Sequence, residues 1–505
     1  MLAKLRSFGL NGLSGYLISV EVDVHGGLPG FDIVGLGDTA VKESKDRVRL
    51  SIRNSGFEYP LGKVVVNLAP ADTKKEGSVF DLAIAIGILC VSKNVALFSA
   101  KEYLYLGELS LDGQLRKVNG LLPILISAKE QGYDNIIIPE ENSPEAQYVD
   151  GLSIYPAKDL SSVVMHLTGE KLIEKLQTKQ WIPDKATDTL HDMMYIKGQY
   201  FAKRAMEIAV AGGHNILMIG APGAGKTMLA KAVPTIMPDM SFEEALEVAK
   251  IYSVSGELTD FVFSRPFRSP HHSATLVSLT GGGAKVKPGE MSLAHNGVLF
   301  LDELPEYPRS VLETLRQPLE DKVINVARAA MSVTYPANFM LVASMNPCPC
   351  GNYGSDTKEC TCSLGQIKKY LSRLSGPLLD RIDINIEVDS LQYKDLKSDD
   401  LAESSAIVKA RIDKARKIQS KRFENVEIFC NAQMTAPLIK KYCKIDEKSQ
   451  QLLENCFVKF NLSARAYNRI LKVARTIADL AGEENISSIH IAESIQYRSN
   501  DIFKV

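Results

Sequence analysis

Hydrophobic and polar positions alternate with two periods over residues 1–165. Runs of β-branched residues such as VVVNLA and IIIPE predict strands, whereas FDLAIAIGILC and LLPILISAKEQG predict helices. The segment LGELSLDGQLRKV predicts a β-hairpin with its turn at Asp112-Gly113, because Asp-Gly suits a tight turn. We therefore expect a compact α/β domain over residues 1–165.

The pattern changes after this domain. Residues 166–195 lose the β period, contain the only Trp and predict a linker. Over 196–390, the helical YFAKRAMEIAVAGG and the strand NILMIG begin an alternation of helices and strands that is typical of a covered parallel sheet. Amphipathic runs such as YNRILKVARTIADLAG predict a helical region over 391–505.

Composition narrows the class of protein. A length of 505 residues predicts about three domains, and 45% hydrophobic with 24% charged residues is typical of a soluble globular protein. A net charge of -1 argues against a protein that coats polyanions such as DNA with its whole surface, but it allows a local basic surface. We expect no signal peptide and no membrane partner, because no stretch approaches roughly 18 apolar residues. Eight cysteines do not make a disulfide scaffold, so we expect a cytoplasmic protein.

A phosphate-binding motif follows the strand NILMIG. The glycines let backbone N–H groups converge on phosphate oxygens, and the following helix N-terminus favours an anion. Lys226 would hold the β- and γ-phosphates of ATP, and Thr227 would ligate Mg²⁺. A glycine-rich turn with an incidental lysine is the alternative, but the motif has the required strand before it and helix after it. The motif consists of Gly220, Ala221, Pro222, Gly223, Ala224, Gly225, Lys226 and Thr227.

Two later strands end in polar residues that suit hydrolysis. GVLFLDEL ends in Asp302, which would hold Mg²⁺ through water, and Glu303, which would activate the attacking water. NFMLVASMNP ends in Asn346, placed to touch the γ-phosphate or the water. An acidic pair at the surface is the alternative. Together with the phosphate motif, these residues predict ATP hydrolysis.

Several long segments resemble the magnesium-chelatase-like branch of the AAA+ ATPases, and most closely the ComM/YifB family. They include PFRSPHHSAT, GEMSLAHNGVLFLDELPE, MNPCPCG, GPLLDRIDINIEV and NLSARAYNRILKVARTIADL. The resemblance covers nearly the whole chain. It implies an α/β protein with an N-terminal Lon-protease-like α+β domain (1–165), a linker (166–195), an AAA+ P-loop parallel-sheet core (196–390) and a C-terminal helical lid (391–505).

The resemblance also implies a function and an assembly. Family members form homo-hexameric rings with ATP at the subunit interfaces, and the ComM members are DNA helicases that promote branch migration during natural transformation. Arg381 in LLDRID would be the arginine finger that reaches the neighbouring subunit's γ-phosphate, with a structural salt bridge as the alternative. Arg465 in LSARAYNR matches the sensor arginine of the lid, and Arg469 is a competing choice. Residues 196–200 would help to line the adenine pocket.

A cationic, glycine-rich segment is the candidate DNA contact. Residues 261–289 contain Arg265, Arg268, Lys285 and Lys287 and no Asp or Glu, which suits gripping the phosphate backbone of single-stranded or branched DNA. In related rings an insertion here projects into the pore together with a hairpin, here VINVARAAMSVTYPA with Arg328 at its tip. A solvated loop or an interface contact is the alternative for each cation. We assign no ligand role to the pair His271-His272.

Four cysteines gather in one loop, CPCGNYGSDTKECTC. Cys348, Cys350, Cys360 and Cys362 predict a tetrahedral Zn²⁺ site, because half of the protein's cysteines lie in this loop. The commoner zinc spacing is C-x₂-C, and reduced free cysteines are the alternative.

The N-terminal domain has lost the residues that proteolysis needs. The resemblance to Lon-type proteases places Val79 at the nucleophile position and Leu122 at the lysine position. Neither side chain can attack a carbonyl or accept a proton. Ser78 is one residue out of register, and Lys117 precedes the Gly120-Leu121 pair by three residues. We expect no protease activity, and a role for this domain in DNA contact or ring organisation.

Two other functions remain open. One is a magnesium-chelatase motor subunit, against which the fused N-terminal domain and the cysteine loop argue. The other is a chaperone-like remodeller of proteins. Stimulation of ATP hydrolysis by DNA would separate both from a DNA translocase.

Overall fold

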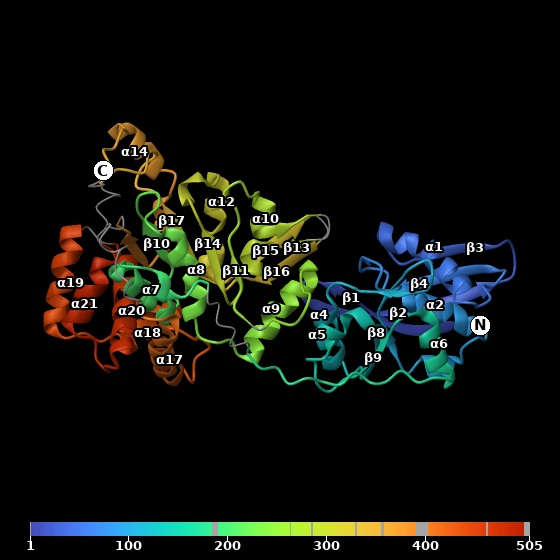
Figure 1. The fold of residues 1–505 in the computed structure, drawn as a ribbon. Coiled ribbons are helices and arrows are strands. Elements are labelled where there is room, and N and C mark those ends of the chain that lie inside the picture. The colour runs from blue at the N-terminus through green and yellow to red at the C-terminus, as the bar shows by residue number, and fades with distance from the viewer. Residues whose placement is uncertain are drawn as a thin grey trace.

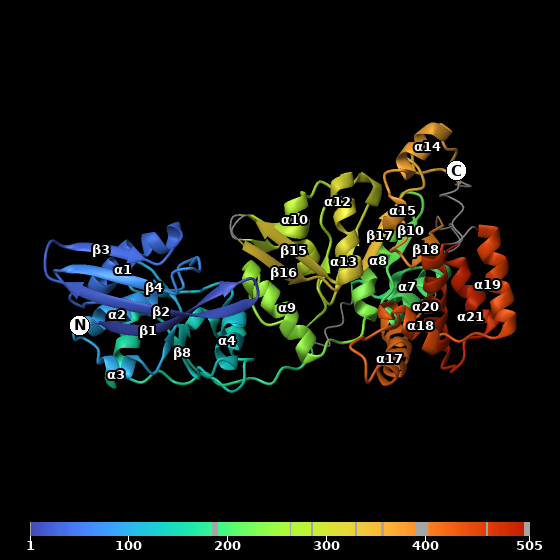
Figure 2. The ribbon, with the colours of Figure 1, turned by 180° about the vertical axis from the view of Figure 1, so that it is seen from behind.

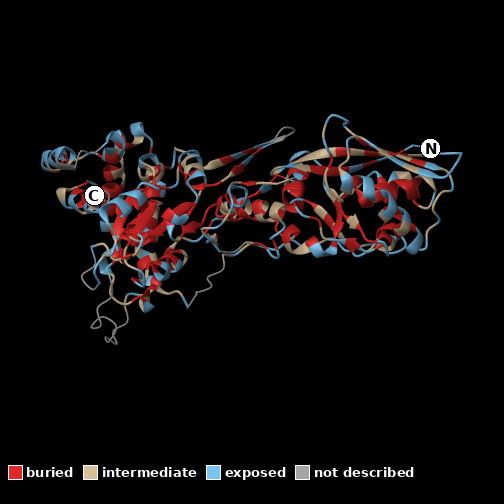
Figure 3. Ribbon diagram, turned by 90° about the horizontal axis from the view of Figure 1, so that it is seen from above, coloured by how far each residue is buried: buried red, intermediate tan, exposed pale blue. Residues whose placement is uncertain are grey.

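The computed structural model describes residues 2–183, 190–262, 264–283, 286–328, 331–354, 358–389, 402–460 and 463–498. The N-terminal domain lies at one end of an elongated molecule, the parallel-sheet core lies in the middle, and the C-terminal helices lie at the other end (Figures 1 and 2). The α/β fold class, with a parallel-sheet core and a helical C-terminal region, is therefore confirmed. Buried residues concentrate inside the N-terminal domain and around the core sheet (Figure 3). No helix in the described part of the chain is long and apolar enough to cross a membrane.

The N-terminal domain is built on a mixed seven-stranded sheet of order β3-β4-β2-β1-β5-β8-β9. Helix α2 (Asp81–Val91) packs on this sheet and is buried on nearly every side, as its continuous apolar sequence predicts. The predicted hairpin is confirmed by the pairing of β6 (Glu108–Leu109) with β7 (Leu115–Arg116), and Gly113 has a positive φ of 91°. The other elements are β1 (Ala3–Asn11), β2 (Ser14–His25), β3 (Gly30–Val34), α1 (Thr39–Asn54), β4 (Lys63–Ala69), α3 (Leu97–Ala100), β5 (Leu104–Tyr105), α4 (Leu121–Glu130), β8 (Asn135–Pro139), α5 (Ser143–Ala146), β9 (Ser153–Ala157) and α6 (Leu160–Thr168).

The core contains a five-stranded sheet of order β11-β14-β17-β10-β18, and every neighbouring pair is parallel. Its carboxyl ends share one edge, where ligands bind in open sheets of this kind. The strands are β10 (Ile216–Ile219), β11 (Phe267–Arg268), β14 (Val298–Leu301), β17 (Met340–Met345) and β18 (Ile384–Glu387); the surrounding elements include α7 (Tyr200–Gly212), α8 (Lys226–Ile236), α9 (Phe242–Ser255), α10 (Leu276–Thr280), α12 (Arg309–Thr314), α13 (Arg316–Asp321), α14 (Leu364–Leu371), α15 (Gly376–Leu379) and the antiparallel hairpin β15 (Val323–Arg328)–β16 (Met331–Pro336).

The C-terminal region is helical, as its amphipathic pattern predicts. In the described part of the chain it includes α17 (Ser405–Arg422), α18 (Ala436–Tyr442), α19 (Glu447–Phe460), α20 (Ala464–Ala481) and α21 (Ser488–Gln496). The region packs on α7 of the core, and Arg204 on α7 pairs with Glu493 on α21 at 2.9 Å.

The N-terminal domain shares a hydrophobic cluster with the core. Helix α4 packs on α9, and Leu122, at the position of the protease lysine, is fully buried in that cluster. The hydroxyl of Ser78 bonds to Glu108, whereas the ammonium of Lys117 donates to the carbonyl of Leu258. These two side chains therefore have separate partners, and the absence of protease activity stays a prediction. Within the predicted linker, Trp181 donates to the carbonyl of Val262 in the core at 3.0 Å.

Candidate active site

The phosphate motif occupies the turn between β10 and α8. Lys226 begins α8 and is buried; its Nζ donates to the carbonyl oxygens of Gly220 (2.7 Å) and Ala221 (2.9 Å) and to Oδ1 of Asn346 (3.2 Å). Burial lowers the pKa of the Lys226 ammonium, while Asp302 and Glu303 oppose this shift. Gly223 (φ 81°) and Gly225 (φ 91°) adopt conformations that favour glycine, and a side chain at either would project into open space, where phosphates would lie.

The acidic pair follows β14 at the same edge of the sheet. Thr227 Oγ1 donates to Asp302 Oδ2 at 3.0 Å, and the hydroxyl of Ser344 donates to the other carboxylate oxygen. A hydroxyl and a carboxylate in contact beside a phosphate cradle are oxygen ligands that fit Mg²⁺. Glu303, at a φ of 53°, is half-exposed and beside them.

His272 is a site residue to which the sequence analysis assigned no role. Its Nδ1 lies 3.3 Å from Oε2 of Glu303. The neighbouring His271 ring lies against it, with centroids 4.0 Å apart, but its own Nδ1 bonds to Ser273 at 2.8 Å. His272 reaches this position because β11 runs parallel to β14, so the residues that follow both strands meet at one edge. This adjacency depends on the order of the strands, which the local sequence does not reveal.

Arg381 lies at the opposite edge of the sheet. It precedes β18, and Ile216 and Ile219 of β10 pair with Ile384 and Glu387 of β18 in parallel register. The phosphate motif follows β10, so roughly 13 Å of strand separates the two edges. The Arg381 guanidinium pairs with Glu320 and donates to the carbonyl of Pro377 at 2.7 Å. In this conformation its partners are therefore Glu320 and Pro377 rather than the phosphate motif of its own chain.

The two sensor candidates differ in their surroundings. Arg469 pairs with the buried Asp383 at 3.1 Å, whereas Arg465, in the first turn of α20, is exposed. Burial alone would raise the pKa of the Asp383 carboxyl, but the contacts with His214 and Arg469 outweigh burial and hold this pKa well below its usual range. Both arginines line a cavity of about 220 Å³ together with Arg381.

The segment 196–200, which is predicted to line the adenine pocket, lies near the phosphate motif, since Gln199 donates to the carbonyl of Ala224 at 3.2 Å.

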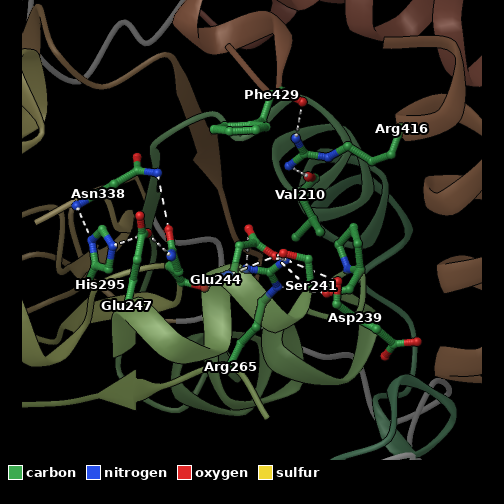
Figure 4. A network of polar contacts seen from close by, with 12 residues as sticks. Val210, Asp239, Ser241, Glu244, Glu247, Arg265, His295, Asn338, Arg416 and Phe429 are labelled. Atoms are coloured by element: carbon green, nitrogen blue, oxygen red, sulfur yellow. Dashed lines mark hydrogen bonds and ion pairs between the residues drawn. The ribbon is translucent and has the colours of Figure 1, made fainter. Parts of the chain in front are cut away.

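Two of the cations predicted to contact DNA are held by carboxylates of their own chain. Arg265 pairs with Glu244 at 2.9 Å and donates to the carbonyl of Asn296 at 2.7 Å, beside the capping residue Ser241 (Figure 4). Arg268 pairs with Glu290 at 2.6 Å and with Glu257 at 3.0 Å. Each has a structural role in this conformation, and their contact with DNA stays a prediction.

The other cations lie nearer the surface of the insertion. Lys287 is exposed and donates to the carbonyl of Ser255 at 3.0 Å. Lys285 lies outside the described residues. Arg328 ends strand β15 of the predicted hairpin, and its side chain also lies outside the described part.

The four loop cysteines converge. Their sulfur atoms all lie within 4.8 Å of one another, and the three pairs among Cys348, Cys350 and Cys360 are 3.4 to 3.6 Å apart. Zinc–sulfur bonds of about 2.3 Å in a tetrahedron place sulfurs about 3.8 Å apart. The cluster, completed by Cys362, therefore has the donors and the spacing of a metal site.

Comparison with known proteins identifies the class and then the family. Three magnesium-chelatase families together match most of the chain. They are subunit ChlI of Mg-chelatase over residues 20–142, magnesium chelatase subunit ChlI over 192–396 and the C-terminal part of that subunit over 402–498. The chain is thus a magnesium-chelatase-like AAA+ protein.

The full-length relatives specify the family. The competence protein ComM of Haemophilus influenzae is 45% identical over 504 residues, which cover 99% of this chain and 97% of that protein. YifB of Escherichia coli is 44% identical over 493 residues, covering 96% and 94%. The chain belongs to the ComM/YifB family. The DNA repair protein RadA of Campylobacter jejuni is 32% identical over 128 residues, covering 25% of this chain and 27% of that protein.

Proposed function

We propose that this protein is a cytoplasmic, homo-hexameric, ATP-driven DNA helicase that promotes branch migration of recombination intermediates during integration of transforming DNA. The observation that carries the proposal is the separation of the phosphate motif and Arg381 at opposite edges of one parallel sheet. A chain with half of a site on each face completes its sites by head-to-tail contacts, which close into a ring. The competence and DNA-repair names of two relatives support DNA as the substrate.

Each residue of the site has its own role in ATP hydrolysis. Lys226 and the backbone of the motif hold the phosphates, while Glu303 orients the attacking water and accepts its proton. Mg²⁺, when bound through Thr227 and Asp302, would neutralise phosphate charge. Asn346 orients the γ-phosphate or the water. Arg381 of the neighbouring subunit stabilises the charge that develops in the transition state.

The sensor arginine belongs to the same face as Arg381. Arg381, Arg465, Arg469 and Lys472 line one cavity, in which Glu320 is the one carboxylate among the described lining residues. Such a cationic face suits the phosphates of the ATP held by a neighbouring subunit, and exposed Arg465 is the better placed of the two sensor candidates.

ATP hydrolysis should increase with single-stranded and with branched DNA, and the protein should move three-strand and four-strand junctions. Lys226→Ala should abolish both activities, because the ammonium is the cation that contacts the phosphates. Steady-state hydrolysis and gel-resolved junction migration are the measurements. ATP hydrolysis that ignores every DNA would contradict the proposal. That result would favour a chelatase-type motor, which the match to the magnesium-chelatase families would support, or a protein remodeller.

His272→Ala should raise ATP hydrolysis without DNA by about two- to fivefold, because an exposed polar contact that restrains Glu303 contributes up to about 1 kcal/mol. His271→Ala is the matched control, since its partner is Ser273 rather than Glu303. His272→Asn, which can still donate to the carboxylate, should stay near the unmodified rate. A lower rate in His272→Ala would instead make His272 a direct aid to hydrolysis.

We also propose that the cysteine cluster binds one structural Zn²⁺. Four thiolates with no open position for water give a closed site of the kind that stabilises loops. Metal analysis of the purified protein should find about one zinc per chain.

A further inference from the structure

We propose that the metal in the cysteine cluster holds the phosphate motif in its nucleotide-binding form, through the contact of Gly351 with Pro222. This inference rests on the proposed zinc site. It assigns that site a regulatory role: ATP binding would depend on metal occupancy.

The cysteine loop is joined to the nucleotide site by its position in the chain. Asn346 directly follows β17, and Cys348, two residues later, is completely buried in the cluster that contains Ile219 and Met345. Asn346 in turn contacts Lys226 at 3.2 Å. The first thiol of the cluster therefore sits two residues from a group that touches the phosphate-binding lysine.

A second connection is made through space. Gly351 has a φ of 82°, and a Cβ built on it would lie 2.5 Å from Cδ and 2.8 Å from Cγ of Pro222, within the phosphate motif. Only a residue without a side chain permits so close an approach. Because Cys350 precedes Gly351, a metal that fixes the cysteine sulfur also fixes the backbone that supports Pro222.

Loss of the metal would remove this support. Without a metal, the sulfurs that now lie 3.4 to 3.6 Å apart would have no common ligand bond to hold them together, so the loop would be free to open. Gly351 would move away from Pro222, and Asn346 would lose its fixed position beside Lys226. Nucleotide affinity should fall by about tenfold or more, the loss typical when groups that orient a site are removed.

The loop offers a matched pair of substitutions. Gly351→Ala should weaken binding of a fluorescent ATP analogue about tenfold while zinc content stays unchanged. Gly354→Ala is the control, since Gly354 lies in the same loop with a φ of 76° and no atom of the described residues lies within 4 Å of a built Cβ. Both substitutions carry the same backbone strain, so only the contact with Pro222 differs.

Metal removal tests the other half of the proposal. Zinc content, analogue affinity and thermal unfolding should be measured before chelation, after chelation, and after zinc is restored, with Cys456→Ser as the control for a cysteine outside the cluster. We expect affinity to fall with zinc content and to recover with it, at a temperature where the apo protein remains folded. Absence of bound zinc, or unchanged affinity in both the apo protein and Gly351→Ala, would overturn the inference. DNA-stimulated hydrolysis, measured separately, would still decide the helicase proposal.

Discussion

Arg381→Ala should lower ATP turnover of the assembled protein by about a thousandfold, with nucleotide binding little changed, since an arginine finger acts on the transition state. Arg381 precedes β18 at the amino edge of the core sheet, whereas the phosphate motif follows β10 at the carboxyl edge. It cannot serve its own chain's ATP without crossing the sheet. Steady-state turnover and analogue affinity, measured on the same samples, separate the two effects.

Glu320→Ala is the control, because it breaks the same ion pair and leaves the arginine in place. If Arg381 were only structural, both substitutions would reduce turnover equally. If it acts on the neighbouring site, Glu320→Ala should retain most activity. Mixing Arg381→Ala chains with Lys226→Ala chains should also restore partial turnover, because some interfaces would combine an intact phosphate motif with an intact arginine. Failure of every mixture to recover activity would contradict a site shared between subunits.

The sequence predicted those parts of the site that follow from local chemistry. The phosphate motif is continuous in the chain, and Asp302 and Asn346 each end an apolar strand. Parallel strands bring such ends to one edge, so Thr227 meets Asp302 and Lys226 meets Asn346. The cysteine cluster was likewise foreseeable, since its four thiols lie within one short loop.

Partners set by tertiary packing could not be predicted. Arg265 and Arg268 lie in a segment without acidic residues, yet each finds a carboxylate on another element, Glu244 on α9 and Glu290 after the insertion. Local composition reports the net charge of a segment, but ion pairing depends on what packs beside it. The same limit applies to His272, whose contact with Glu303 requires knowledge of the strand order.

The predicted linker shows a related limit. Within the predicted linker (166–195), residues 170–183 form neither helix nor strand, whereas α6 continues to Thr168 and a short 3-10 helix spans Met193–Tyr195. The pattern could not show that Trp181 would dock on the core, because that contact uses one aromatic ring and one carbonyl rather than a repeating period. Nor could it show that α4 would pack on α9 and bury Leu122, the residue that the resemblance places at a protease lysine position.

Glu303→Gln should bind ATP normally but hydrolyse it about a hundredfold to ten-thousandfold more slowly, the range expected when a general base is lost. The amide keeps the size of the side chain but cannot accept the proton of the attacking water. Glu306→Gln is the matched control three residues away, where the carboxylate pairs with Arg373 at 2.8 Å and lies outside the proposed chemistry.

Because Glu303→Gln would retain ATP, it should also accumulate as a stable nucleotide-bound assembly on DNA, visible by size-exclusion chromatography with light scattering. Equal turnover in Glu303→Gln and Glu306→Gln would assign the base to another residue. If Glu303→Gln turns over slowly but no assembly accumulates, then ATP binding alone does not hold the subunits together. Hydrolysis and ring formation would in that case be separate properties.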